Sequence, residues 1–132
     1  MANKNNTSFP SCTVTITLTP EARNFLAGTT AGVSHFAIYN DLLDNMAIVD
    51  TSFSKRGNIV PLLTGQAESS AHSMSERWKL GRKSMVRILS TMDDLGIIRL
   101  HTSRLASISD MLSVDKCQTN DGDICYPDFS NL

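Results

Sequence analysis

The residues that could do chemistry in this 132-residue chain are concentrated in one short segment. Basic and hydroxyl side chains follow one another there: Arg82, Lys83, Ser84, Arg87, Ser90 and Thr91. Such groups donate hydrogen bonds to phosphate oxygens, and an arginine can also bind a guanine edge through two parallel donors. The segment is therefore a candidate nucleic-acid-binding surface, to which Arg77 and Arg104 add charge from either side.

The periodicity of the same segment predicts an amphipathic helix. With about 100° of rotation per residue, one arc contains only apolar side chains. They are Met85, Ile88, Leu89, Met92 and Leu95. Lys83, Arg87 and Ser90 then lie on the opposite face. Gly96 follows directly, at a position where helices commonly end on a residue with positive φ. A basic amphipathic helix alone is more often a core helix with a solvated face, so its neighbours in the chain decide the interpretation.

Those neighbours predict a winged helix-turn-helix. Ser69 or Ser70 can cap a preceding short helix that carries Met74 and Trp78. After Gly96, residues 98–101 alternate as a strand does, and residues 105–109 offer a return strand across a short basic turn. Helix, turn, helix and hairpin in this order are typical of that fold.

The predicted fold assigns a role to each candidate residue. Lys83, Ser84 and Arg87 are expected to face base edges in the major groove of double-stranded DNA. Another group is expected near phosphates: Arg77, Arg82, Ser90 and Thr91. Arg104, in the turn of the wing, is expected to approach the minor groove or the backbone.

The distribution of charge along the chain agrees with this interpretation. Residues 55–104 contain nine basic and four acidic side chains, a net charge of +5, whereas the remaining residues carry −6. The nearly neutral total of −1 therefore conceals a basic centre between acidic flanks, the distribution expected of a chain that contacts phosphates. Ordinary surface charge is the alternative explanation.

The central segment also resembles known families. The pattern of the winged-helix domain of GntR-type bacterial transcription regulators is matched by Met74, Trp78, Leu80, Arg82, Met85, Leu89, Met92, Gly96 and Ile97. Gly65, Gln66, a serine at Ser69 or Ser70, Trp78 and Arg82 resemble small winged-helix proteins and replication-protein N-terminal domains of phages, plasmids and conjugative elements. The resemblance covers a third to a half of the chain and implies a DNA-binding protein of a bacterial mobile element.

The chain departs from the regulators at three points. Gly81 stands where they usually have the serine that caps the recognition helix, and Lys79 replaces the usual turn glycine. No segment resembles the large effector-binding domain that follows their wing, so the resemblance does not extend to small-molecule sensing.

Upstream residues predict further elements. Residues 13–18 alternate as a strand, and Thr19 with Pro20 opens a short helix that runs to Leu26. Ser34 caps the next helix, whose predicted stripe is Phe36, Tyr39, Leu43 and Met46, with Leu42 beside it. Residues 59–63 are predicted to be the first strand of the winged sheet. The fold class is thus α+β, a winged helix-turn-helix with an extra N-terminal strand and short helix. That strand could pair with its own sheet or with a second copy, and we expect a homodimer.

The expected organisation is a single domain between two polar ends. Residues 1–12 are predicted to be a mobile N-terminus, and residues 13–114 to form the winged-helix domain, with a helix-turn-helix at 69–95 and a wing at 97–114. Residues 115–132 are predicted to be an acidic tail. The tail could be solvated, could screen the basic surface or contact a partner, or could be docked by Tyr126 and Phe129.

Other classes find little support. No run approaches the roughly 18 to 20 apolar residues of a membrane span, and the start lacks the layout of a signal peptide, so a cytoplasmic protein without a membrane partner is expected. Cys12, Cys117 and Cys125 lack zinc-site spacing. Reduced thiols are expected, with a Cys117–Cys125 disulfide as the minor alternative. The three histidines form no metal or catalytic pattern, and no phosphate-binding glycine loop is present, so neither an enzyme nor a cofactor or metal is expected.

Two functions from different classes remain. The first is sequence-specific binding of double-stranded DNA, as a transcription regulator of a bacterial mobile element. The alternative is a non-catalytic interaction module that helps to assemble a replication or DNA-transfer complex.

Overall fold

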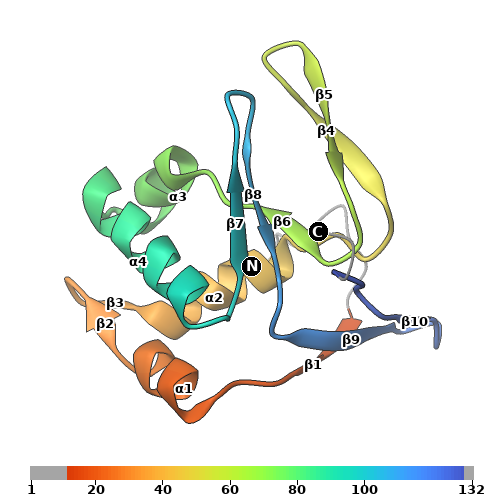
Figure 1. Ribbon diagram of the computed structural model, residues 1–132, viewed down its shortest axis with the longest axis horizontal. Coiled ribbons are helices and arrows are strands. Elements are labelled where there is room, and N and C mark those ends of the chain that lie inside the picture. The colour runs from red at the N-terminus through yellow and green to blue at the C-terminus, as the bar shows by residue number, and fades with distance from the viewer. Residues whose placement is uncertain (1–11, 130–132) are drawn as a thin grey trace.

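The computed structural model describes residues 12–129 as an α+β fold (Figure 1). Its helices are α1 (Pro20–Leu26), α2 (His35–Asp44), α3 (Ala71–Trp78) and α4 (Arg82–Asp94). Its strands are β1 (Cys12–Ile16), β2 (Thr29–Thr30), β3 (Val33–Ser34), β4 (Thr51–Lys55), β5 (Asn58–Leu62), β6 (Gln66–Glu68), β7 (Arg99–Thr102), β8 (Ser107–Asp110), β9 (Val114–Thr119) and β10 (Ile124–Cys125). The predicted mobile N-terminus lies outside the described residues, except that Cys12 begins β1.

Three of the helices begin at the hydroxyl residues that the sequence predicted. Thr19 caps α1, Ser34 caps α2 and Ser70 caps α3, and each accepts a hydrogen bond from the backbone N–H three residues later. These bonds satisfy donors that the first turn of a helix leaves without a partner. At the start of α4 the N-cap is Gly81, which has no side chain to accept such a bond.

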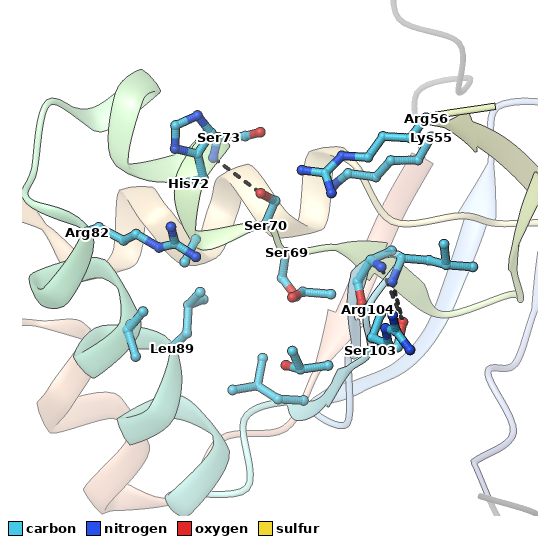
Figure 2. Close-up of a pocket in the computed structure, with 17 residues that line it drawn as sticks. Lys55, Arg56, Ser69, Ser70, His72, Ser73, Arg82, Leu89, Ser103 and Arg104 are labelled. Atoms are coloured by element: carbon cyan, nitrogen blue, oxygen red, sulfur yellow. Dashed lines mark hydrogen bonds between the residues drawn. The ribbon is translucent and has the colours of Figure 1, made fainter. Parts of the chain in front are cut away.

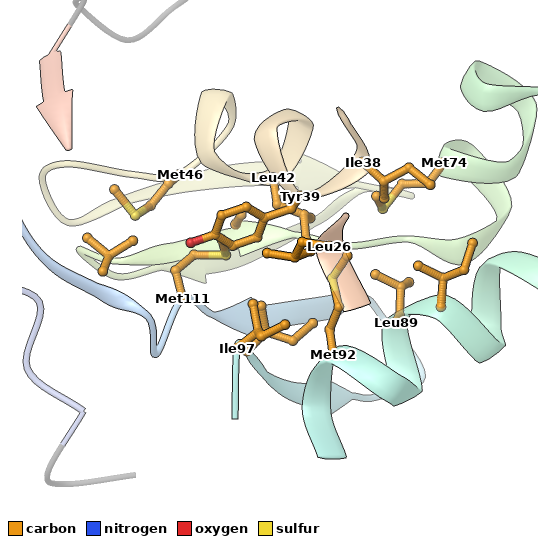
Figure 3. Packing of buried hydrophobic residues seen from close by; sticks show 14 of the residues in the cluster. Leu26, Ile38, Tyr39, Leu42, Met46, Met74, Leu89, Met92, Ile97 and Met111 are labelled. Carbon is orange, nitrogen blue, oxygen red and sulfur yellow. The ribbon is translucent and has the colours of Figure 1, made fainter. Parts of the chain in front are cut away.

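The core lies where α4 packs against the other helices and the central sheet (Figure 3). The predicted stripe is confirmed, since Met85, Ile88, Leu89 and Met92 are all buried, and Gly96 ends the helix with φ of 74°. Tyr39 is also fully buried. Its hydroxyl lies 2.6 Å from Ser113 Oγ, and burial raises the pKa of Tyr39.

The stripe predicted for α2 is partly wrong. The helix buries His35, Ile38, Tyr39 and Leu42. This buried face is rotated from the predicted one. Phe36 is consequently 49% exposed. Met46 is buried, but it lies beyond the last helical residue, Asp44.

Three antiparallel strands in the order β6-β8-β7 form the central sheet. The predicted hairpin after α4 is confirmed as β7 and β8, with Thr102 opposite Ser107 across the turn. The strand predicted at 59–63 is present as β5, but its assignment to this sheet is wrong, because β5 pairs with β4 in a separate hairpin and β6 takes the place beside β8. Pro61 donates no backbone hydrogen bond, which suits β5 to a two-stranded hairpin better than to the middle of a sheet.

The N-terminal strand and the predicted tail belong to one further sheet. Its order is β1-β9-β10, so β1 pairs within its own chain, and residues 115–119 are a strand rather than free tail. The predicted wing, 97–114, likewise ends earlier, since β8 stops at Asp110. Cys117 and Cys125 face each other in the sheet, with their Cα atoms 5.4 Å apart, and form a disulfide. The expectation of reduced thiols is therefore wrong for this pair. No helix within residues 12–129 has the length and apolar character needed to cross a membrane.

Candidate nucleic-acid interface

A concave surface lies between the starts of two helices and the ends of two hairpins. The first residues of α3 and of α4 form one wall, and the turn of the β7–β8 hairpin forms the other (Figure 2). The turn of the β4–β5 hairpin closes a third side. We call this space, of about 650 Å³, the basic hollow, after the cations Lys55, Arg56, Arg82 and Arg104 that line it.

The charge of the basic hollow is one-sided. None of the described residues that line it is an aspartate or a glutamate. The carboxylate of Glu68 lies beside it and binds Lys55 Nζ at 2.8 Å. Arg56, Arg82 and Arg104 have no hydrogen-bonded or ionic side-chain partner within residues 12–129. Three arginines converging without a counter-charge favour an anionic ligand.

The outer face of α4 continues this surface. Lys83, Arg87 and Ser90 are exposed there, whereas Ser84 is half-buried. Thr91 donates its hydroxyl to the Arg87 carbonyl at 2.8 Å, so this side chain is engaged within the helix. Of the predicted contact residues, Arg82 and Arg104 thus line the basic hollow, while Lys83, Arg87 and Ser90 are exposed on α4 outside its lining.

Arg77 is placed elsewhere. Its guanidinium binds Asp41 of α2 through Nη2 at 2.7 Å and Nε at 3.1 Å. The indole of Trp78 donates to the same carboxylate oxygen at 2.9 Å. Trp78 packs partly buried against the core, and Asp41 draws Arg77 toward α2 rather than toward the basic hollow.

A buried polar cluster fixes the β7–β8 hairpin to β6. Asp110 is fully buried and accepts hydrogen bonds from Gln66 Nε2 at 2.8 Å and Arg99 Nε at 3.1 Å. His101 Nε2 lies 2.7 Å from the same carboxylate. Because a buried carboxylate is costly without such partners, the cluster favours one position of the hairpin, and with it of Arg104.

The β4–β5 hairpin contributes residues that the sequence reasoning did not select. Its turn consists of Arg56, with φ of 51°, and Gly57, with φ of 80°, between the paired residues Lys55 and Asn58. Two residues with positive φ, the second a glycine, are typical of a tight hairpin turn, so the Arg-Gly pair was the available signal. At the base of the hairpin, Asp50 accepts two hydrogen bonds from Thr64, which lower the pKa of Asp50.

The arrangement suits recognition of an extended anion more than a reaction. It offers guanidinium and ammonium donors on an open surface, together with the half-buried hydroxyl of Ser84. Such donors bind phosphate oxygens and base edges. No protein-family model, curated protein or solved structure matches this chain.

Proposed function

We propose that residues 35–110 form a winged helix-turn-helix and that the protein binds double-stranded DNA in a sequence-specific manner. Apart from the β4–β5 hairpin between α2 and β6, the order of elements is α2, β6, α3, α4 and the β7–β8 hairpin, which supports this, as does the β6-β8-β7 strand order. One observation carries the proposal. Arg82 at the start of α4 and Arg104 on the hairpin line one concave surface that has no lining carboxylate in the described part of the chain, and Lys83 and Arg87 are exposed on the same helix.

The dimensions of α4 are compatible with this role. Its 13 residues span about 20 Å, and the major groove, about 12 Å wide, admits such a helix. In this proposal Lys83, Ser84 and Arg87 face base edges, while Arg82 and Ser90 lie near phosphates. Arg104 reaches the minor groove or the adjacent backbone. Two predicted phosphate contacts are left out: Asp41 already binds the guanidinium of Arg77, and the Thr91 hydroxyl donates to the Arg87 carbonyl.

The biological setting is part of the same proposal. The resemblance to regulators and replication proteins of mobile elements suggests that the protein controls transcription in such an element. Dimeric binding to a near-palindromic site would suit this role. The edge of β1 opposite β9 is the place for a second copy, since β1 is the outer strand of its sheet.

Binding to a randomised pool of duplexes, followed by sequencing of the retained fraction, tests the proposal. A preferred site should emerge, and Arg87→Ala should weaken binding to it by about 1–3 kcal/mol and relax the preference at one base pair. Lys83→Ala and Arg104→Ala should lower affinity as well.

Arg23→Ala is the matched control, because Arg23 is exposed on α1 and does not line the basic hollow. Its affinity should equal that of the unaltered protein. Unchanged affinity and preference in both Lys83→Ala and Arg87→Ala would reject the groove assignment of α4. A failure of the unaltered chain to bind duplex at low salt would reject DNA binding and favour an assembly module.

A further inference from the structure

The β4–β5 hairpin lies against the same basic hollow as α4 and the β7–β8 hairpin. In Figure 1 the two hairpins project from the same side of the molecule, and Lys55 and Arg56 from the β4–β5 turn line the hollow opposite Arg82 (Figure 2). We infer that this hairpin is a second DNA-contacting arm and that Arg56 at its tip binds the phosphate backbone of the duplex that α4 engages. The inference rests on the proposed function and extends its contact surface.

The arm is held in a fixed position relative to the β7–β8 hairpin. A second small core joins the two, in which Val60 and Leu62 of β5 are buried with Ile108 of β8. Phe53 of β4 packs partly buried against this core. Because side chains of both hairpins share one apolar cluster, Arg56 and Arg104 are presented to a ligand at a set separation rather than on independent loops.

An ion pair adds to this support. Lys55 Nζ binds the carboxylate of Glu68 at 2.8 Å, and Glu68 is the last residue of β6, shortly before the Ser70 cap of α3. The ion pair of Lys55 with Glu68 thereby joins the arm to β6, the strand that leads into the proposed helix-turn-helix. Arg56, exposed and without a partner within residues 12–129, retains its full capacity to bind an anion.

The position of Arg56 favours backbone contact over base recognition. It occupies a tight two-residue turn, and the basic hollow, which includes Arg104, lies between this turn and the wall formed by α3 and α4. A duplex that fills its major groove with α4 presents phosphates to both sides of that helix. Contacts of this kind raise affinity for every sequence equally and are sensitive to salt.

The test measures the affinity of random and preferred duplexes over a range of salt concentrations. Arg56→Gly is the chosen variant, because glycine adopts the positive φ of this position readily, so the charged side chain is removed without straining the turn. We expect it to lower affinity about three- to tenfold on both duplexes and to reduce the slope of log affinity against log salt by about 1. Arg56→Lys should restore most of the slope, and Arg23→Ala should leave it unchanged.

A hydroxyl-radical footprint supplies the spatial readout. Arg56→Gly should lose protection at backbone positions flanking the site while keeping protection in the groove that α4 occupies. Normal affinity, slope and footprint in Arg56→Gly, together with a loss in Lys83→Ala, would overturn the second arm and leave the proposed function intact. Absence of duplex binding by the unaltered protein would overturn both.

Discussion

Asp41 determines which arginines of the α3–α4 segment are available to a ligand, because it binds Arg77. Its carboxylate accepts hydrogen bonds from Arg77 Nε and Nη2 and from Trp78 Nε1, all on one oxygen. Asp41 is largely buried, at 16% side-chain exposure, whereas Arg77 is 49% exposed. The pair therefore ties α3 to α2 and removes Arg77 from the surface where Lys83 and Arg87 remain open.

We expect Asp41→Ala to destabilise the protein by about 1–3 kcal/mol, because it leaves the half-buried indole N–H of Trp78 without its acceptor. Arg77→Ala should cost less, about 1 kcal/mol or below, since exposed ion pairs contribute little. Urea unfolding followed by Trp fluorescence measures both free energies. An equal loss in the two variants would show that the ion pair, and not the indole hydrogen bond, joins the helices.

At the scale of the element, α4 begins without a side-chain cap. Gly81 occupies the N-cap with φ of −64° and ψ of 150°, a conformation open to any residue, and a Cβ added there would meet no atom within 4 Å. A serine at this position can accept a hydrogen bond from the backbone N–H of Ser84. The helix that we propose for the major groove is thus less stabilised at its start than α1, α2 or α3.

Gly81→Ser should therefore stabilise the protein by about 0.5 kcal/mol, through the new cap and the reduced freedom of the unfolded chain. Differential scanning calorimetry should show a rise in Tm of roughly 1–3 °C. Gly81→Ala is the control, because it removes the same freedom but offers no acceptor. If alanine stabilised as much as serine, capping would not be the cause.

How far the elements could be predicted depends on how local their causes are. The caps at Thr19 and Ser34, the stripe of α4 from Met85 to Met92 and the stop at Gly96 are confirmed, and Ser70 is the cap of the two serines that the sequence left open, because each of these features depends on residues within a few positions of one another. The β4–β5 hairpin was missed because its stabilising partners are remote. Its strand β4, with the polar sequence TSFSK, has little apolar pattern, and its small core needs Ala106 and Ile108.

The same distinction applies to the candidate site. The exposed face of α4 follows from helical periodicity, so the exposure of Lys83 and Arg87 was predictable. The engagement of Arg77 was not, because Asp41 lies 36 residues earlier in the chain. Arg56 enters the basic hollow only through the packing of one hairpin on another, which no short sequence pattern specifies.

At the scale of the whole molecule, the two ends of the described chain pair in one sheet. β9 pairs with β1 on one side and β10 on the other, and the Cys117–Cys125 disulfide joins β9 to β10. The chain then returns to the central sheet. Arg99 Nη2 donates to the Phe129 carbonyl at 3.3 Å, and Gly65 lies so close to Pro127 and Phe129 that an added Cβ would approach them to 2.5 Å and 2.8 Å.

The contacts of Pro127 and Phe129 lead to a prediction about the acidic C-terminal segment. If it acted as a free tail that competes with phosphates for Lys83 and Arg87, its removal would tighten DNA binding at low salt, where charges are screened least. If it is a packed part of the fold, its removal exposes Gly65 and its surroundings and leaves Arg99 with one partner fewer. The contacts of Pro127 and Phe129 favour the second result.

A chain ending at Cys125 keeps the disulfide and all ten described strands, so it isolates the contribution of residues 126–132. We expect it to be less stable by about 1–3 kcal/mol, from the apolar surface of Pro127 and Phe129 that becomes exposed. Its affinity for random duplex at low salt should equal that of the full chain. Thermal melting, and fluorescence anisotropy at two salt concentrations, distinguish a packed segment from a screening tail. Tighter binding with an unchanged Tm would mean that the segment screens the basic surface instead of completing the core.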